Sequence, residues 1–366
     1  MPLPGDDRWM GLALALGRRG MGRVWPNPAV GCVIVKDGRL HGRGWTAPGG
    51  RPHAETQALA QAGAAARGAT AYVSLEPCAH HGQTPPCADA LAAAGVARVV
   101  TALEDPDPRV AGGGHGRLRA AGIAVETGLR CDEARRDHRG FLLRVRAGRP
   151  MVTLKLAATL DGRIATADGE SRWITGPAAR REVHAQRARH DAVMVGSATA
   201  RADDPALTVR GLGMGHQPVR VICDTRLSVS TESRLGRTAR EVPVWLCHGA
   251  DAPEAARQAW TRAGARLLPC ETGADGHLDI ADALGQLGAA GLTRVFCEGG
   301  GTLAAALLSA GCADALVTFS AGLAIGAEGR PALGAMGLDR LAAAPRFTLR
   351  ETRAIGDDAM QLWDRA

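Results

Sequence analysis

The sequence predicts an α/β protein made of two layered domains, and three observations support this prediction. The chain has 366 residues, whereas single domains usually contain about 100–200, so two domains are expected. Short β-branched segments alternate with alanine-rich segments in both halves, a pattern typical of sheets covered by helices on both faces. Apolar residues make up 46% of the chain and charged residues 22%, a balance that allows large buried cores.

The first half alternates helix and strand from Asp6 to about Leu143. Strand 29–35 (AVGCVIV) is short, β-branched and followed by a turn at Asp37-Gly38. Helix 84–95 is expected to have Thr84 as its N-cap and Pro85 in its first position, where the missing N–H is harmless. The expected elements are helix 8–19, strand 29–35, helix 53–68, strand 70–75, helix 84–95 and strand 97–103.

Residues 144–150 (RVRAGRP) are charged and contain Gly148 and Pro150, so they are expected to link a domain of residues 1–145 to one of residues 151–366. The second half is again of the α/β type, and we find no internal repeat. Its expected elements are strands 152–157, 191–196, 219–223, 242–247 and 293–300, helices 176–189 and 301–311, and a loop at 211–217.

Charge and cysteine content narrow the functional class. The net charge of +7 permits polyanion binding, but no basic run of the nucleic-acid-arm type is present, and a phosphorylated small substrate explains the charge equally well. The nine cysteines show no disulfide-framework spacing, the N-terminal residues do not resemble a signal peptide, and the apolar stretch 303–327 is interrupted by Asp314 and glycines. We expect a cytoplasmic homo-oligomer without nucleic-acid or membrane partners.

A candidate zinc site joins two distant segments. His53 and Glu55 open a predicted helix, Cys78 follows a predicted strand, and Cys87 lies at the start of the next helix. One imidazole and two thiolates leave a tetrahedral zinc ion one open position, which is typical of catalytic sites. Zinc lowers the pKa of a water in that position to about 7. Glu55 is close enough in sequence to His53 to take the proton of that water and pass it to a leaving amine.

The spacing of these residues departs from the H-x-E and P-C-x-x-C motif of zinc nucleobase deaminases. Eight residues separate Cys78 from Cys87, and they include His80 and His81. Either histidine could bind the metal or contact substrate. A structural zinc site with one of them as a fourth ligand, and unrelated core cysteines, are the alternatives. The combination of HAE with SLEPC and a further cysteine favours catalytic zinc.

Four segments carry a family resemblance: 26–35 (PNPAVGCVIV), 53–55 (HAE), 74–87 (SLEPCAHHGQTPPC) and 105–114 (DPDPRVAGGG). They closely resemble the deaminase domain of the bifunctional riboflavin-biosynthesis deaminase–reductases. The resemblance implies a three-layer, cytidine-deaminase-like fold, zinc ligands at His53, Cys78 and Cys87, and a proton-transferring Glu55. Asn27 either binds substrate or forms a turn between Pro26 and Pro28, and both interpretations stay open.

A glycine-rich turn is the best candidate nucleotide site. Residues 297–302 (CEGGGT) follow a predicted strand and lead into a helix that begins near Gly301. Glycines let a backbone approach a phosphate closely, and a helix N-terminus offers free N–H groups. The alternative is a tight turn that binds nothing. No G-x-G-x-x-G dinucleotide fingerprint is present, and Gly211, Gly213 and Gly215 form a chance cluster.

Four further segments resemble the reductase domain of the same family: 155–165 (KLAATLDGRIA), 170–176 (ESRWITG), 202–210 (ADDPALTVR) and 297–308 (CEGGGTLAAALL). The resemblance implies a dihydrofolate-reductase-like fold that uses NADPH. It places around NADPH the residues Ala157, Trp173, Thr199, Asp203 and Thr225 and, at its phosphates, Gly300, Gly301, Thr302, Leu303, Ala304, Ala305 and Ala306. It places around the ribose phosphate substrate Ser171, Arg187, Leu207, Arg210 and Glu298.

The chemistry of these residues suits the implied roles, and each also has a structural interpretation. Arg187 and Arg210 can bind a phosphate through charge-assisted hydrogen bonds, or can be solvated arginines. Trp173 can stack on a cofactor ring or pack in the core. Lys155, one of only two lysines, can handle a proton together with Asp203, or the two can form a structural ion pair.

The resemblance implies a two-step function. The first domain would deaminate 2,5-diamino-6-(5-phosphoribosylamino)pyrimidin-4(3H)-one, and the second would reduce the ribosyl group of 5-amino-6-(5-phosphoribosylamino)uracil with NADPH. One alternative is a deaminase acting on a polynucleotide such as tRNA, with an appended binding domain, but aromatic residues for base stacking are scarce. Another is a zinc-stabilised binding module, which the intact His53, Glu55, Cys78 and Cys87 disfavour.

Overall fold

The computed structural model describes residues 3–80, 85–107 and 111–366. It divides into two compact units, Met1–Gly148 and Arg149–Ala366. The predicted linker at 144–150 is too long, because helix α5 (Cys131–Ala147) continues through residues 144–147. The helix ends at Gly148, whose φ of 68° is left-handed and favours glycine. The predicted end of the first domain at residue 145 therefore falls inside this helix.

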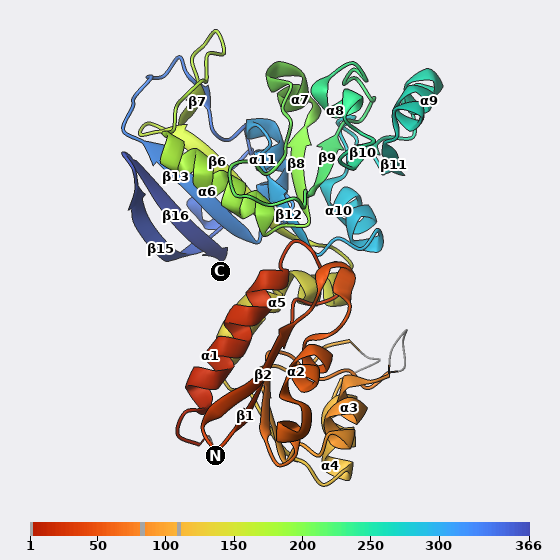
Figure 1. Ribbon diagram of the computed structural model, residues 1–366. Helices are drawn as coiled ribbons and strands as arrows, with labels where there is room; N and C mark the ends of the chain where they lie inside the picture. The colour runs from red at the N-terminus through yellow and green to blue at the C-terminus, as the bar shows by residue number, and fades with distance from the viewer. Residues whose placement is uncertain (1–2, 81–84, 108–110) are drawn as a thin grey trace. The chain divides into compact units, whose positions relative to one another are not determined.

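The N-terminal unit is a three-layer α/β fold, as expected (Figure 1). Its five strands lie in the order β2-β1-β3-β4-β5, with β1 antiparallel to β2 and β3 and with β3, β4 and β5 parallel. Besides α5, its elements are α1 (Asp6–Gly17), α2 (Ala54–Ala62), α3 (Cys87–Ala93), α4 (Gly113–Ala120), β1 (Gly31–Lys36), β2 (Arg39–Trp45), β3 (Thr70–Val73), β4 (Arg98–Thr101) and β5 (Ala124–Thr127).

Two cores hold these layers together. On one face of the sheet, α1 and α5 pack on the strands, for example through Leu14 and Val33. On the other face, α2, α3 and α4 pack on the strands, for example through Leu91 and Ile34. All four of these side chains are at most 2% exposed. The alternation along β1 explains this arrangement, because successive side chains of a strand point to opposite faces.

Two predicted helices differ from the structure at their ends. The helix expected over 53–68 stops at Ala62, where Gly63 has a φ of 52°, and a short 3₁₀ turn follows. Helix α3 begins at Cys87 with Pro86 as its N-cap, so Pro85 is not the first helical residue. A residue that precedes a proline is disfavoured in the helical region, and Pro85 precedes Pro86. The predicted N-cap Thr84 lies outside the described residues.

Strand β2 was not predicted, because Gly42 and Gly44 interrupt the pattern of β-branched and apolar residues that indicates a strand. A Cβ atom at Gly42 would overlap the Ala58 carbonyl oxygen, and one at Gly44 would overlap the Ala54 carbonyl oxygen. Both carbonyls belong to α2. The glycines are therefore the reason that α2 lies so close to the strand.

The C-terminal unit is built on a nine-stranded sheet in the order β11-β10-β9-β8-β12-β6-β13-β16-β15. The strands from β11 to β13 in this order run parallel, and β16 and β15 form an antiparallel hairpin at one edge. The elements are β6 (Met151–Thr159), β7 (Arg163–Ala165), α6 (Pro177–Ala188), β8 (Ala192–Gly196), α7 (Ser197–Asp203), β9 (Val219–Cys223), α8 (Arg234–Arg237), β10 (Val244–His248), α9 (Glu254–Ala263), β11 (Arg266–Pro269), α10 (Ile280–Ala289), β12 (Arg294–Cys297), α11 (Gly301–Ser309), β13 (Ala315–Ala321), β14 (Arg330–Pro331), β15 (Phe347–Ile355) and β16 (Asp358–Arg365).

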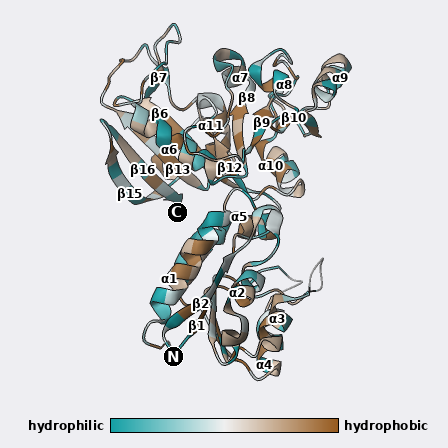
Figure 2. Ribbon diagram, viewed as in Figure 1, coloured by the Kyte–Doolittle hydropathy of each residue, from teal (hydrophilic) through white to brown (hydrophobic). Residues whose placement is uncertain are grey.

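Helices cover the central strands, whose residues are hydrophobic in Figure 2. Helices α7, α8 and α9 contribute to one core, which contains Trp260 and Leu246. Helix α6 packs on the neighbouring strands, where Ala179 meets Phe296 and Phe319. In the part of the chain that the structure describes, no helix is both long and apolar enough to cross a membrane.

The parallel strands place several predicted site residues at one edge of the sheet. Strand β12 pairs with β6 and with β8, so that Cys297 lies beside Leu154 on one side and Met194 on the other. The strand predicted over 293–300 ends at Cys297, and the glycines form the turn before α11. Ligands of open α/β sheets bind at this carboxyl edge.

Candidate active sites

The structure brings together His53, Cys78 and Cys87. His53 is the N-cap of α2, Cys78 lies in the loop after β3, and Cys87 is the first residue of α3. The His53 Nδ1 atom lies 3.3 Å from the Cys87 Sγ atom and 3.7 Å from the Cys78 Sγ atom. The backbone N–H of Cys87 donates to the Cys78 Sγ atom over 3.3 Å. Two of the ligands therefore stand at the start of a helix, and the third lies in a loop that the Cys87 N–H contacts.

These distances fit a tetrahedral zinc ion. Ordinary Zn–N and Zn–S bond lengths require N···S separations of about 3.6 Å and S···S separations of about 3.8 Å. All three donor atoms lie within 4.8 Å of one another. Among the residues that the structure describes, no fourth side chain joins the group, and His80 is outside it. His81 lies outside the described residues. An open fourth position is the arrangement of catalytic zinc sites.

Glu55 lies beside this group, on the first turn of α2, and is only 3% exposed. Burial and the nearby Cys78 raise the pKa of its carboxyl group to about 7. The hydrogen bond from Cys87, followed by that from His53, lowers the pKa of the Cys78 thiol to about 4 in spite of its burial. Glu55 is thus placed to exchange a proton near neutral pH, and Cys78 to act as a thiolate ligand.

Glu76 supports this site, a role that the sequence analysis missed. The Glu76 carboxylate accepts backbone hydrogen bonds from Asp105 (3.2 Å), Gly112 (3.1 Å) and His115 (3.0 Å). It lies two residues before Cys78 and so joins the zinc loop to the start of α4. The sequence does contain a signal for this role, because Glu76 stands between an apolar strand and Pro77. An acidic residue there is expected to be buried, and a buried carboxylate requires hydrogen-bond donors.

Asn27 packs against the chain that leads to His53. A Cβ atom at Gly50 would overlap the Asn27 side-chain amide, and Gly50 has a φ of 88°. Glycine is therefore required there. This contact is compatible with both interpretations of Asn27, which stay predictions.

At the carboxyl edge of the large sheet, Lys155 lies beside Glu298. Leu154 pairs with Cys297, so the residues that follow them are at the same level of β6 and β12. Burial lowers the pKa of the Lys155 amine, while the negative charges of Glu298 and Asp203 oppose this effect. The sheet register therefore brings Lys155 beside Glu298, and Asp203, at the end of α7, lies close enough to act on Lys155 through its charge.

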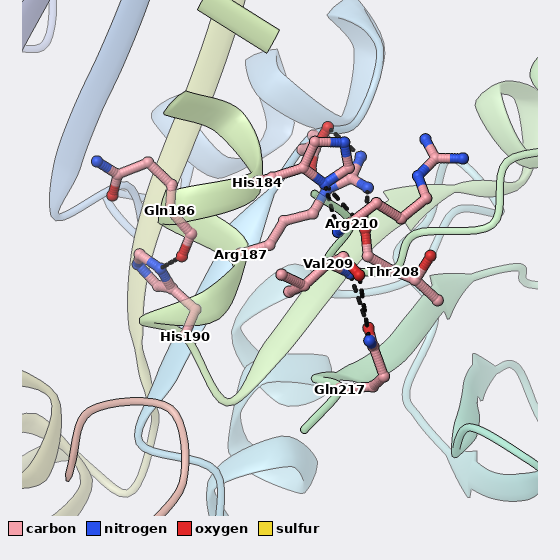
Figure 3. Close-up of polar contacts among 9 residues, drawn as sticks. His184, Gln186, Arg187, His190, Thr208, Val209, Arg210 and Gln217 are labelled. Carbon is pink, nitrogen blue, oxygen red and sulfur yellow. Dashed lines mark hydrogen bonds and ion pairs between the residues drawn. The ribbon is translucent and has the colours of Figure 1, made fainter. Parts of the chain in front are cut away.

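Arg187 is bound to Glu298 rather than free. Its guanidinium donates to both carboxylate oxygens, over 2.5 and 3.0 Å, and its third nitrogen donates to the Thr208 carbonyl oxygen over 2.8 Å (Figure 3). Each of its three nitrogens thus has a protein partner. The predicted phosphate fork at Arg187 is therefore largely occupied by Glu298.

Arg210 differs from Arg187, because its side chain is exposed. Its backbone N–H donates to the His184 Nδ1 atom over 3.2 Å (Figure 3). Val209, the residue before Arg210, is joined to the Gln217 side chain by two hydrogen bonds of its backbone. The sequence analysis singled out neither His184 nor Gln217, because nothing in their spacing indicates a contact with this segment.

The glycine-rich turn also has the predicted geometry. Helix α11 begins at Gly301 without a side-chain cap, and the Gly300 N–H donates to the Thr199 hydroxyl over 3.1 Å. The first N–H groups of α11 are thus available to a ligand. Thr302 is exposed, whereas Leu303 and Ala306 are half-buried. The side chains of Ala304 and Ala305 lie in the core, at 0% and 4% exposure, so they do not face a phosphate.

The other predicted residues differ in exposure. Trp173 is 67% exposed, with the Arg180 guanidinium 4.5 Å from its ring centre, so core packing is wrong for this tryptophan. Leu207 is 3% exposed and packs in a core cluster. Its side chain therefore packs in the core, and its φ of 52° is left-handed. The role of Leu207 at the substrate stays a prediction, in which only its backbone would be available. Half-buried positions at or near this edge are Ala157, Ser171 and Thr225, and Asp203 is exposed at the end of α7.

Comparison with known proteins identifies both units. Residues 4–103 match the family model of the cytidine and deoxycytidylate deaminase zinc-binding region. Residues 150–361 match that of the RibD C-terminal domain. The second unit thus matches a reductase-type domain, and the alternative of an appended nucleic-acid-binding domain is not supported.

Full-length relatives give the same result. The riboflavin biosynthesis protein RibD of Escherichia coli is 46% identical, over 96% of this chain and 97% of the relative. The structure of Acinetobacter baumannii RibD is 40% identical, with a TM-score of 0.89 and complete coverage of both chains. A Thermotoga maritima deaminase/reductase structure is 32% identical, with a TM-score of 0.85 over 99% of both chains. The N-terminal unit is therefore cytidine-deaminase-like, the C-terminal unit is dihydrofolate-reductase-like, and the chain belongs to the RibD family of bifunctional riboflavin biosynthesis enzymes.

Proposed function

We propose that this chain catalyses two consecutive reactions of riboflavin biosynthesis. The N-terminal unit removes the 2-amino group of 2,5-diamino-6-(5-phosphoribosylamino)pyrimidin-4(3H)-one by hydrolysis. The C-terminal unit reduces the ribosyl group of 5-amino-6-(5-phosphoribosylamino)uracil to a ribityl group with NADPH. The buried Glu55 beside the three-donor group, at the positions that the sequence motif predicts, is the observation that carries the proposal.

In the deamination, His53, Cys78 and Cys87 hold zinc, which supplies an activated water when bound. Glu55 accepts the proton of the attacking water and delivers it to the departing amino group, which leaves as ammonia. A carboxyl group with a pKa of about 7 is suited to both transfers at neutral pH, because it accepts and releases a proton with similar ease. Burial of Glu55 also keeps bulk water from taking the proton.

In the reduction, NADPH supplies the reducing equivalents when bound. The α11 N-terminus and the Gly300 turn bind its phosphates, and Trp173 offers an exposed aromatic face. Arg210 binds the substrate phosphate, because it is exposed and its backbone contacts His184 on α6, the helix that also carries Arg187. Lys155 donates the proton that completes reduction of the sugar, and its lowered pKa favours that release.

One assay tests both reactions. Ammonia release and the loss of NADPH absorbance are followed together from the diaminopyrimidinone, with and without NADPH. We expect ammonia release without NADPH, and NADPH loss only after deamination. Glu55→Gln should stop ammonia release while zinc stays bound, whereas Glu104→Gln, an exposed matched control, should not. NADPH loss without prior deamination would contradict the proposed order.

Lys155→Gln separates the second reaction from the first. We expect it to lower the rate of NADPH loss and to leave ammonia release unchanged. A variant with unchanged NADPH loss would assign Lys155 to a structural ion pair instead. The cytoplasmic location and the homo-oligomeric state stay predictions, and light scattering of the purified protein tests the second.

A further inference from the structure

Side chains, rather than strand pairing, hold the backbone that carries Arg210. Val209 donates its N–H to the Gln217 Oε1 atom over 2.7 Å, and its carbonyl oxygen accepts from Gln217 Nε2 over 3.1 Å. The Gln217 side chain therefore makes the same two backbone hydrogen bonds with Val209 that a neighbouring β-strand would make. The preceding carbonyl, of Thr208, accepts from Arg187 over 2.8 Å. Figure 3 shows these contacts converging on residues 208–210.

His184 completes this set of contacts. Its Nδ1 atom lies 3.2 Å from the backbone nitrogen of Arg210 and 3.1 Å from the Thr208 carbonyl oxygen. A single ring nitrogen either accepts from the first or donates to the second. Because Arg187 already donates to Thr208, an unprotonated Nδ1 that accepts from Arg210 satisfies both backbone groups. The neutral ring with its proton on Nε2 is therefore the form that fits.

The charges around His184 favour the same neutral form. Burial lowers the pKa of the His184 ring, and the charges of Arg187 and Arg210 lower it further, whereas Glu298 and the contact with the Thr208 carbonyl act in the opposite direction. Two positive guanidinium groups disfavour protonation of the ring, and only one carboxylate, that of Glu298, favours it. Arg187 already binds this carboxylate.

Arg210 is the residue that this arrangement leaves available. Its side chain is exposed, and within the described ranges no ion pair or side-chain hydrogen bond engages its guanidinium. Arg187, in contrast, is occupied by Glu298. Because the backbone is held at three successive residues, an anion that binds the Arg210 guanidinium has only the side chain, and not the loop, left to order.

We propose that His184 and Gln217 are positioning residues for Arg210, and that they direct its guanidinium to the phosphate group of the reductase substrate. The proposal rests on the proposed function of the C-terminal unit. Neither residue touches the substrate, so both act only through Arg210. Loss of either residue should weaken binding of the phosphorylated substrate and leave the chemical step nearly unchanged.

A double-mutant cycle tests this inference in the full-length protein at saturating NADPH. His184→Leu removes the acceptor and should raise KM for the deaminated substrate by about five- to tenfold, the effect of one lost hydrogen bond, with kcat nearly unchanged. His184→Asn offers an oxygen near the position of Nδ1 and should restore most of the loss. Gln186→Ala is the matched control, because this residue of the same helix bonds Glu182 through its side chain.

The effect must disappear when Arg210 is absent. In an Arg210→Gln background, His184→Leu should produce no further rise in KM, since the two residues act as one unit. An equal rise in both backgrounds, or failure of His184→Asn to restore KM, would overturn the inference. If Arg210→Gln alone leaves KM unchanged, the assignment of Arg210 in the proposed function fails as well. Gln217→Leu provides a second test with the same expected pattern should His184→Leu not fold.

Discussion

Arg187 and Glu298 form a two-pronged ion pair that ties α6 to the turn after β12, with N···O distances of 2.5 and 3.0 Å. Their side chains are only 11% and 10% exposed, so neither charge is well solvated. The pair therefore fixes the residue that leads into the glycine-rich turn.

Removal of one partner should destabilise the protein. We expect Arg187→Met to lower the free energy of unfolding by about 3 kcal/mol, because Glu298 is left buried without its partner. Urea unfolding measures this change. Arg181→Met, at an exposed position of the same helix, should have little effect. Adding Glu298→Gln to Arg187→Met should recover part of the loss, and a further loss instead would contradict this explanation.

The prediction of the fold from sequence succeeded where a residue pattern is typical of a single kind of structure, such as a buried strand. Strands such as β1 and β8 are short, β-branched and buried, and the helix that His53 and Glu55 open and the turn at Gly300 lie where the pattern indicates. The zinc site was predictable because its three ligand types fit a single chemistry. The prediction of β2 failed, since Gly42 and Gly44 serve a close helix contact that only the assembled fold reveals.

The segment of residues 207–210 was predictable only in part, because its contacts also depend on the assembled fold. Leu207 belongs to a recognisable segment, yet it has a left-handed φ of 52° and a side chain buried in the core, neither of which the sequence indicated. His184 and Gln217 contact Arg210 and Val209 from other parts of the chain, and no local sequence pattern indicates these contacts. Sequence similarity therefore identified the segment, whereas the assignment of roles within it required the contacts.

Loss of a zinc ligand should separate the two activities. Cys87→Ser, or removal of zinc with a chelator, should abolish ammonia release, because the remaining donors no longer hold the metal. NADPH loss from supplied 5-amino-6-(5-phosphoribosylamino)uracil should persist. Metal analysis and the two assays measure these outcomes. Cys131→Ser, outside the three-donor group, should retain zinc. Full zinc content in Cys87→Ser would show that the ligand set is different.

Thr199 should affect the cofactor rather than the substrate. Thr199→Val has nearly the same shape but lacks the hydroxyl that accepts from the Gly300 N–H. Since the turn then loses one anchoring hydrogen bond, we expect KM for NADPH to rise by about fivefold. Steady-state kinetics at saturating substrate measures this change, and Thr199→Ser, which keeps the hydroxyl, should behave like the parent. A rise in the KM of the pyrimidine substrate alone would contradict a role at the cofactor phosphates.

His190 should make the stability of the C-terminal unit sensitive to acid. It is 4% exposed, its Nδ1 donates to the Gln186 carbonyl oxygen over 2.7 Å (Figure 3), and its Nε2 lies 2.9 Å from the Thr153 hydroxyl. Burial, aided by the charge of Arg294, lowers its pKa to about 3. Between this value and the unfolded pKa of about 6.5, the unfolded chain binds a proton that the folded chain excludes.

The free energy of unfolding should therefore fall as the pH is lowered through 6.5, by about 2 kcal/mol at pH 5 relative to pH 8 for this one group. His190→Asn keeps a donor near the Gln186 carbonyl and has no titrating ring, so its stability should lose this part of the pH dependence even though it is less stable at pH 8. Urea unfolding of both proteins at pH 5 and pH 8 measures the difference, with the exposed His277→Asn as the control. If the parent and His190→Asn show the same pH dependence, the ring is protonated in the folded protein, and burial does not exclude the charge.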